Sequence, residues 1–565
     1  MPNFKSCCYL GILAASWVGV MAHSAVLLPT LTPNTSPNLL DSLHTSLHTP
    51  SPVARAIITQ SVESVPFQRV TSTPTPNAWA SRLPEMISGE GFISQQQNRQ
   101  LGEWALRQIY HDAPLIDDPW LQYSLEQLCW QMNASVRREA PLALVVINEP
   151  QINAFAVPSG LIGLNVGLLD KARNIDELAS VLAHEIAHVS QRHFEQRSDE
   201  KNKQLATQVG GLLAGLLAAK VSDGDAGAAV MIGTQTISAN QIAAFSRAQE
   251  READRVGMQI MAQSGYDVRA MPSFFALLNQ QHPMPTKRLI PSFVMSHPLT
   301  AERLSEATDR ARTYGAAPTA TQQNTANHAA RNTLFDQLQW RARYLAKLTN
   351  RAELIQAVNN NARNLQNANG ARLALVMSYL DTREYAAASR VLAPLQPMIA
   401  NLSDPLAVMV AASLDERQGD ARAALDRLTR LSRLLPERRD VKYALADVYL
   451  RQAPSRTNAQ AVMDLMLPIS RQYPTDLHVW QNLTQASEQL SKLSTGSQQT
   501  LYQANTLRYR AQVEYWHNDL TEAVTSLNQA KRLAQTLPSM QAAPVLASIN
   551  QQTERVQVAH RFKPS

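Results

Sequence analysis

The run His184-Glu185-Ile186-Ala187-His188 constrains the fold of this chain more than any other feature of its sequence. On an α-helix, residues four apart lie on one face, so His184 and His188 can present their imidazole nitrogens to a single metal ion. Glu185 would then lie beside the metal, where a carboxylate can take a proton from a water molecule that zinc activates. The run is therefore predicted to fold as a helix that lines a metal-binding cleft.

The residues around this run indicate a buried helix. Four apolar residues surround the motif: Val181, Leu182, Ile186 and Val189. A helix that forms the wall of a cleft requires such a pattern, whereas a surface helix that carries two histidines by chance would be polar on all sides. Asn174 or Asp176 can cap the start of the helix, and we expect it to continue past His193. His193 lies off the ligand face and is interpreted as a group that supports the site or as a surface residue.

A third ligand must come from elsewhere in the chain, because catalytic zinc usually has three protein ligands and one open position. Glu250 is the predicted third metal ligand. It begins the run Glu250-Arg251-Glu252-Ala253-Asp254, in which a helix would place Glu250 and Asp254 one turn apart on the same side. Asp254 would accept the N–H of a ligand histidine and fix its tautomer. Taken alone, this run also fits an ordinary charged helix face.

Together, these two motifs resemble those of the gluzincin metallopeptidases that include the CAAX prenyl endopeptidases, HtpX and Oma1. Three further segments are similar to a soluble periplasmic branch of that group: Asn153–Gly160, His188–His193, and Ser296–Leu299 with Arg303. The resemblance covers roughly residues 80–555. It implies an α+β gluzincin-type metallopeptidase domain that binds one Zn2+ per chain, followed by an all-α tetratricopeptide-like solenoid.

The same resemblance brings His297 and Arg303 to the predicted site. His297 would either occupy the fourth zinc position, displacing water and keeping the enzyme latent, or donate a hydrogen bond to the oxyanion of the tetrahedral intermediate. A buried histidine with a purely structural role is the third interpretation. Arg303 would either help to stabilise the negative charge of the intermediate or brace the loop that carries His297.

A short β region is expected to form one edge of the cleft. The apolar, β-branched run Leu142–Ile147 and the segment Asn153–Asn165 are predicted to be paired strands. An extended substrate would add as a further strand at Asn153, Ala154 and Phe155 through main-chain hydrogen bonds. Such a site would select unfolded segments rather than a particular sequence.

The length of 565 residues exceeds that of one ordinary domain, so two folded units are expected. We predict a zinc metallopeptidase domain over residues 80–313, a linker over 314–332 and a tetratricopeptide-like helical repeat domain over 333–558. Pro405, Pro436 and Pro474 recur at intervals of 31 and 38 residues, close to the repeat length of about 34 residues. A plain helical bundle is the alternative to the repeat.

The first residues are typical of an export signal. Lys5 precedes an apolar run from Cys7 to Met21, and small residues follow it, so residues 1–24 are predicted to be a cleaved signal peptide. A membrane anchor is the alternative, but roughly 20 apolar residues are needed to span a bilayer. Residues 25–79, rich in Ser, Thr and Pro, are predicted to be an unfolded tether. The expected location is the periplasm.

Charge and hydropathy narrow the expected partners. The net charge is +6, and the sequence contains no run of Lys and Arg with interleaved aromatic residues. Nucleic acid is therefore not expected as a partner. The apolar segment 205–221 is interrupted by glycines, which argues against a membrane span. A mobile lid, a hairpin that contacts the membrane peripherally and a buried helix remain open for this segment.

The resemblance implies a periplasmic zinc-dependent endopeptidase that acts in the quality control and assembly of outer-membrane proteins, with chaperone-like activity. The implied substrates are unfolded or stalled outer-membrane proteins, and the helical repeats would contact the outer-membrane protein assembly machinery. The alternative is a tetratricopeptide scaffold or chaperone for the same assembly process with a latent peptidase. An integral-membrane peptidase is disfavoured, because no later segment has enough uninterrupted apolar residues to span a bilayer.

Overall fold

A computed structural model describes residues 95–136, 142–193, 246–280, 293, 296–314, 322–360 and 369–562. The predicted signal peptide (1–24), the tether (25–79) and the apolar segment 205–221 lie outside these residues. Among the residues described, no helix combines the length and the apolar character needed to cross a bilayer.

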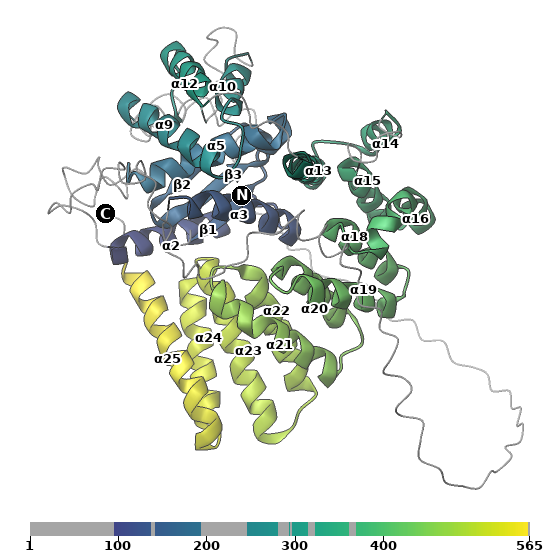
Figure 1. The fold of residues 1–565 in the computed structure, drawn as a ribbon. Coiled ribbons are helices and arrows are strands. Elements are labelled where there is room, and N and C mark those ends of the chain that lie inside the picture. The colour runs from purple at the N-terminus through teal and green to yellow at the C-terminus, as the bar shows by residue number, and fades with distance from the viewer. Residues whose placement is uncertain are drawn as a thin grey trace, which may run out of the picture. The chain divides into compact units, whose positions relative to one another are not determined.

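The N-terminal part of the described chain combines a small sheet with helices (Figure 1). Its first elements are α2 (Gln95–Asp112), α3 (Pro119–Ala134), β1 (Ala143–Ile147), β2 (Ala154–Val157), the 3-10 turn η2 (Pro158–Gly160) and β3 (Leu161–Asn165). The helices that follow are α4 (Val166–Lys171), α5 (Ile175–Ser190), α9 (Arg247–Gln263), α10 (Ala270–Gln280) and α12 (Ala301–Thr313). The expected combination of helices with a small sheet is therefore present in this part of the chain.

The sheet has three strands in the order β1-β3-β2. β1 pairs with β3 in parallel, whereas β2 and β3 form an antiparallel hairpin. The segment 153–165 thus contains two strands rather than the single partner expected for 142–147. The chain reverses at η2, where Ser159 and Gly160 both have positive φ angles of 73° and 72°, a conformation that ends a strand.

Helices cover both faces of the sheet. Alternate strand residues pack with α3 and α5 on one face: Leu144, Val146, Ala154, Ala156, Ile162 and Leu164. The others pack with α2 and with later helices on the opposite face: Ala143, Val145, Ile147, Phe155, Val157 and Leu161. Because every strand residue is buried, the sheet is an interior layer shared by two hydrophobic cores.

The predicted motif helix is α5. The side chain of Asn174 accepts a hydrogen bond from the Glu177 N–H, 2.9 Å away, and so caps the helix as expected. The prediction that the helix continues past His193 is wrong, because α5 ends at Ser190 and Arg192 adopts a positive φ of 53°. This turn directs the chain back toward the last turn of α5.

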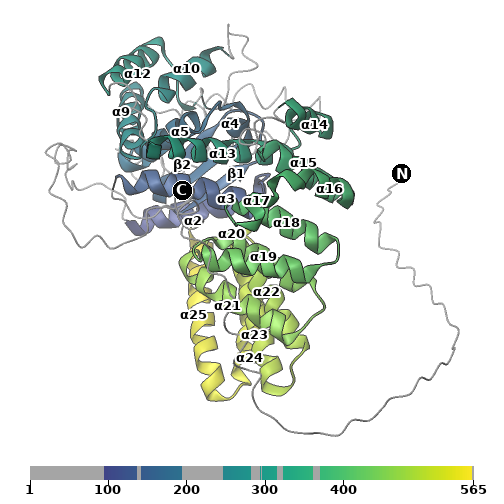
Figure 2. The same cartoon turned by 45° about the vertical axis from the view of Figure 1, so that its right-hand side comes forward.

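The C-terminal part of the chain is helical (Figure 2). It contains α13 (Gln322–Leu345), α14 (Arg351–Asn360), α15 (Asn369–Asp381), α16 (Tyr385–Leu392), the 3-10 turn η6 (Ala393–Leu395), α17 (Gln396–Ala400), α18 (Pro405–Arg417), α19 (Ala421–Leu434), α20 (Arg439–Arg451), α21 (Arg456–Gln472), α22 (Leu477–Lys492), α23 (Gly496–Trp516), α24 (Leu520–Gln535) and α25 (Ser539–Arg561). No strand occurs within 322–360 or 369–562. The expected helical character of this part is confirmed.

Helix pairs begin near the three prolines on which the repeat prediction rests. Pro405 is the first residue of α18, Pro436 lies between α19 and α20, and Pro474 lies between α21 and α22. Proline is favoured at such positions, because it lacks the N–H that a helix interior needs. The helices therefore follow one another as pairs, and assignment of these pairs to the tetratricopeptide class stays a prediction.

Part of the segment predicted as a linker between the two domains is helical. Helix α13 begins at Gln322, inside the segment 314–332 predicted as a linker. Its residues Phe335 and Leu338 are buried in the core of the N-terminal part. The Gln339 side chain donates hydrogen bonds to carbonyl groups around α4, including that of Leu169 at 2.9 Å. Burial and hydrogen bonding thus attach α13 to the peptidase-like part, which the polar composition of the segment does not reveal.

Ion pairs also join the two parts, and those of Arg439 are buried whereas Asp117 is exposed. Arg439 of α20 contacts Glu126 of α3 and Asp476, whose Oδ2 lies 3.0 Å from Arg439 Nε. His478 of α22 places its Nε2 2.7 Å from Asp117 Oδ1. Burial alone would lower the pKa of His478, but its hydrogen bonds to Asp117 and Asp476 raise it to about 10. His478 is therefore protonated in the folded protein at neutral pH.

We expect the stability of the folded protein to decrease as the pH rises from about 6.5 toward 10. The folded state keeps a proton on His478 that the unfolded chain, with a histidine pKa of about 6.5, releases. This stabilisation is complete below the pKa of the unfolded state and is lost as the pH rises through the pKa of the folded state. A pKa shift of this size corresponds to a stabilisation on the order of a few kcal/mol. Urea unfolding at pH 6, 8 and 10 measures this loss.

The variants His478→Gln and His560→Gln provide the comparison. His560 is exposed near the end of α25, so its replacement should leave the pH dependence unchanged. His478→Gln should flatten it. If the free energy of unfolding of His478→Gln depended on pH as steeply as that of the unaltered protein, the role assigned to this ion pair would be contradicted.

Candidate metal centre

Two helices and one loop bring four potential metal ligands together. α5 provides His184 and His188, α9 provides Glu250, and the loop before α12 provides His297. One ligand atom from each lies within 4.8 Å of the others, and all four side chains are buried, with exposed fractions of at most 2%. Within the described residues, this is the one group of histidines, cysteines and carboxylates recorded as able to hold a metal ion.

The ligand atoms face one another at short distances. His184 Nε2 and His188 Nε2 are 3.0 Å apart, and His297 Nδ1 lies 3.3 Å from His184 Nε2. Glu250 Oε1 lies 3.0 Å from His297 Nδ1. Three imidazole nitrogens and a carboxylate oxygen therefore converge on one point.

The outer nitrogens of the two α5 histidines face other partners. His184 Nδ1 lies 3.0 Å from Asp254 Oδ1, and His188 Nδ1 lies 3.0 Å from His193 Nδ1. A hydrogen on Nδ1 leaves the lone pair of Nε2 directed to the centre of the cluster, which is the tautomer that a metal requires. Imidazole nitrogens with a carboxylate oxygen are a donor set typical of zinc. The residues present thus fit a zinc ion.

Charge at this centre also favours a cation. Burial alone would lower the pKa of His184, but Asp254 and Glu250 raise it to about 9. Burial alone would raise the pKa of Glu250, yet His297 and His184 hold it well below its usual value. Burial alone would also raise the pKa of Asp254, but Arg303 and His184 lower it. The two carboxylates are thus ionised and attract positive charge into a buried site.

Arg303 of α12 holds the acidic residues of the cluster in place. Its Nε and Nη2 atoms each donate to Asp254 at 2.8 Å, and its Nη1 lies 2.9 Å from Glu250 Oε2. Nη1 also donates to the Pro298 carbonyl at 3.0 Å. The guanidinium thus contacts Asp254, Glu250 and the loop at Pro298, and of the two roles considered for Arg303, this geometry fits bracing. A chain of contacts runs from Arg303 through Asp254 to His184.

Glu185 lies between the cluster and the sheet. Its side chain is 1% exposed, and burial raises its pKa, whereas a hydrogen bond from the Ala156 backbone lowers it. Its Oε1 lies 3.5 Å from His297 Nε2. A carboxylate whose pKa is raised by burial next to potential metal ligands is suited to accept and return a proton.

The residues predicted to hold substrate lie on β2, at the edge of the sheet beside α5. Ala154 and Phe155 belong to β2, and Asn153 immediately precedes it. The ring of Phe155 lies over Gly163, where an added Cβ would be 2.2 Å from Phe155 Cζ. The Phe155 side chain thus has a packing role, so only the main chain of this segment remains as a candidate for binding substrate.

Two further residues lie near the centre: His193, for which the sequence left a supporting or a surface role open, and Phe293, which the sequence did not assign to the site. His193 is completely buried, because the turn at Arg192 returns it to His188. Helical periodicity places it off the ligand face, and only the end of α5 brings it back. The ring of Phe293 lies 4.9 Å from that of His297, centroid to centroid, and no motif marks this residue.

Residues 116–311 match the model of Peptidase family M48. The chain carries a peptidase M48 domain. This match includes both motif helices and the loop that provides His297. Zinc is the metal that this family of metallopeptidases uses, in agreement with the donor set.

Curated proteins with similar sequences bear related names. The chain is 36% identical over 244 residues to the beta-barrel assembly-enhancing protease of Yersinia pestis, a match that covers 43% of this chain and 50% of that protein. The protein of the same name from Escherichia coli K12 is 34% identical over 234 residues, 41% of this chain and 47% of that protein. The mitochondrial metalloendopeptidase OMA1 of Arabidopsis thaliana is 30% identical over 167 residues, 29% of this chain and 32% of that protein. The chain thus spans about half the length, or less, of the curated relatives it matches.

We expect Asp254→Asn to weaken zinc binding by about 10–100-fold, the usual effect of losing the partner of a ligand histidine. The amide cannot provide the charge that orients His184 and pairs with Arg303. Competition with a chromophoric chelator measures the zinc affinity. Asp309→Asn is the control, because Asp309 is exposed on α12 and pairs only with Arg312 among the contacts recorded for it. Equal affinities of the two variants would contradict the positioning role of Asp254.

Proposed function

We propose that the chain is a periplasmic zinc-dependent endopeptidase that acts on unfolded or stalled outer-membrane proteins. The observation that carries this proposal is the convergence of His184, His188 and Glu250 with Glu185 beside them. The M48 match supports peptide hydrolysis. The names of the curated relatives, which describe proteases that enhance β-barrel assembly, support the class of substrate.

In this proposal, His184, His188 and Glu250 hold the metal. When bound, zinc supplies a Lewis acid that polarises the scissile carbonyl and lowers the pKa of water to about 7. Glu185 takes a proton from the attacking water and returns it to the leaving amine. Asp254 and Arg303 keep the ligand histidine and carboxylate in position.

The substrate would bind at the edge of β2. Main-chain groups of Asn153, Ala154 and Phe155 would pair with an extended segment, which therefore adds to the sheet as a further strand. The hydrogen bond from Ala156 to Glu185 links this strand to the proton acceptor. A site built on main-chain pairing selects chains that are not folded, as quality control of β-rich proteins requires.

The export signal, the tether and the repeat class belong to the same proposal. Removal of residues 1–24 would release a mature protein that begins near Ala25 in the periplasm. The paired helices from α18 onward would form a tetratricopeptide-like solenoid that contacts the outer-membrane protein assembly machinery and gives chaperone-like assistance. Recurrent prolines at the starts of helix pairs support this interpretation.

A scaffold with a latent peptidase is the second candidate function, and the position of His297 favours latency. His297 Nδ1 lies 3.3 Å from His184 Nε2 and 3.0 Å from Glu250 Oε1, so it belongs to the group that could hold the metal. A fourth protein ligand would close the open position that catalysis needs. Displacement of the loop that carries His297 would then activate the enzyme.

Glu185→Gln is expected to abolish proteolysis while the protein keeps its zinc. An amide cannot accept the proton, and loss of a general base typically costs 10²–10⁴-fold in rate. Cleavage of a urea-unfolded outer-membrane β-barrel protein, with metal content measured in parallel, provides the test. Glu302→Gln, at an exposed position on α12, is the control. If Glu185→Gln kept its proteolytic activity, Glu185 would not be the proton acceptor. If this variant rescued an envelope defect in cells, the scaffold function would be favoured over the peptidase.

His297→Ala is expected to increase the rate of cleavage severalfold, since it opens the fourth position of the metal. A decrease of about 10²–10³-fold would instead identify His297 as the donor to the oxyanion. Steady-state cleavage of the same unfolded protein, at saturating zinc, measures the change. An unchanged rate would leave His297 with a structural role only.

A further inference from the structure

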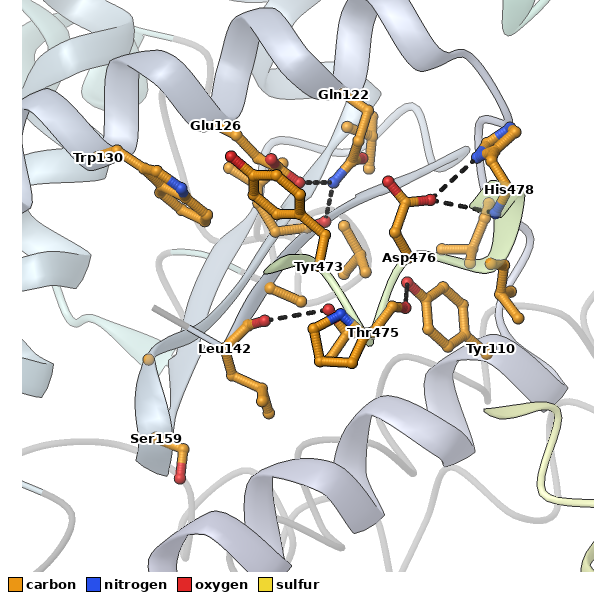
Figure 3. Close-up of a pocket in the computed structure, with 18 of the residues that line it drawn as sticks. Tyr110, Gln122, Glu126, Trp130, Leu142, Ser159, Tyr473, Thr475, Asp476 and His478 are labelled. Atoms are coloured by element: carbon orange, nitrogen blue, oxygen red, sulfur yellow. Dashed lines mark hydrogen bonds and ion pairs between the residues drawn. The ribbon is translucent and has the colours of Figure 1, made fainter. Parts of the chain in front are cut away.

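A cavity of about 1020 Å³ lies along β1, the strand at the other edge of the sheet from β2 (Figure 3). Residues of α3, the end of α2, and the segment 472–478 before and at the start of α22 complete its walls. Its volume is at the upper end of the roughly 300–1,000 Å³ typical of sites for small ligands. The cavity is therefore large enough for several residues of a peptide.

The main chain of β1 faces this cavity. Five consecutive residues line it: Leu142, Ala143, Leu144, Val145 and Val146. Side chains of a strand alternate between the two faces of a sheet, so consecutive lining residues mean that the strand is exposed to the cavity by its edge. We call this cavity and the β1 edge the β1 groove.

Side chains take the places of a neighbouring strand along the β1 groove. Gln122 Nε2 donates to the Leu144 carbonyl, and Thr475 Oγ1 donates to the Leu142 carbonyl at 3.3 Å (Figure 3). An unpaired edge strand offers such carbonyls to any incoming chain. If Gln122 and Thr475 rotated away, an N–H of an incoming peptide would replace them as the donor to each carbonyl.

Strand pairing already begins at one end of this edge. The Ile116 N–H donates to the Val146 carbonyl at 2.9 Å, and Leu115 forms an antiparallel bridge with Ile147. The edge therefore accepts an antiparallel partner at its C-terminal end. A peptide in the β1 groove would continue this ladder toward Leu142.

The walls of the groove favour aromatic and neutral side chains. Tyr110, Trp130 and Tyr473 line it, and aromatic walls provide large contact areas for alternate side chains of a bound strand. Within the walls, Arg439 pairs with Glu126 and Asp476, and His478 pairs with Asp117. With Arg99, Arg192 and Asp118, which also line the groove, four basic side chains face four acidic ones. The groove thus lacks an excess charge that would select a strongly ionic ligand.

The groove also extends toward the metal centre. Ser159 and Gly160 of the hairpin, and His188, Val189 and Arg192 at the end of α5, line its far end. His188 is a predicted metal ligand, so a segment bound along β1 would have one end close to the helix that carries the cluster. The groove would retain a chain whose other part reaches the β2 edge.

We propose that the β1 groove binds an extended polypeptide segment with alternating polar and aromatic or apolar residues as an antiparallel strand on β1. Strands of outer-membrane barrels have this alternation. The inference rests on the proposed function only for the source of the segment, an unfolded outer-membrane protein. It gives the protein a second, non-catalytic binding edge that holds the substrate.

Hydrogen exchange on the full chain carrying Glu185→Gln tests this proposal without cleavage. The probe is a fluorescein-labelled ten-residue peptide of alternating Thr and Tyr. Binding should slow deuterium uptake in the segment 142–147. If the peptide slowed deuterium uptake only in residues 153–157, it would bind on β2 alone, and the proposal would be overturned. Absence of binding at millimolar peptide concentration would overturn it as well. Binding with protection of 142–147 in a protein that proves unable to hydrolyse peptides would refute the proposed function but not this inference.

A matched pair of substitutions provides an independent arm. Gln122→Trp fills the β1 groove and should weaken binding of the peptide at least tenfold, as measured by fluorescence anisotropy. Gln485→Trp makes the same change at an exposed position of α22 outside the cavity and should leave the affinity unchanged. Thermal unfolding checks that both variants fold, and Thr475→Trp replaces Gln122→Trp if the latter does not. Equal affinities of the folded groove variant and the control would overturn the proposal.

Discussion

The close packing of α5 against α9 is the contact on which the rest of the structure depends. The candidate metal ligands come from both helices, so their nitrogen and oxygen atoms meet only if the two backbones approach closely. Gly257 of α9 permits this approach, because an added Cβ would lie 3.3 Å from the backbone nitrogen of His184. Arg303 then joins the carboxylates of α9 to α12 and so connects the cluster to the last helix of the M48 domain.

The small sheet links this cluster to the helical part of the chain. Its strands are buried on both faces, one against the helices of the metal centre and the other against α2 and the C-terminal helices. The two edges therefore remain as the places where another strand can add. In the proposed function, the β2 edge beside Glu185 serves cleavage, and in the further proposal the β1 edge, which lies along the cavity, retains a chain. The proposed action on unfolded β-rich substrates would use both edges.

The sequence predicted the helices of the site better than the strands and the boundaries. His184, Glu185 and His188 were assigned from spacing alone, and Glu250 and Asp254 followed from the need for further ligands. The hairpin at η2 was missed, because its reversal depends on two positive φ angles that apolar patterning does not show. The start of α13 was also missed, since its polar early residues resemble a linker and only Phe335 and Leu338 show burial in the other part.

The sequence by itself determined which residue types can bind zinc and activate water, because helical periodicity places two histidines four residues apart on one face. It also determined the helical character of the C-terminal part. Only the tertiary structure decided that His193 turns back to His188, that Arg303 braces Asp254 and Glu250, and that a cavity lies along β1. These features join segments far apart in the chain. They depend on how the helices and the sheet pack, and periodicity within one segment carries no information about that packing.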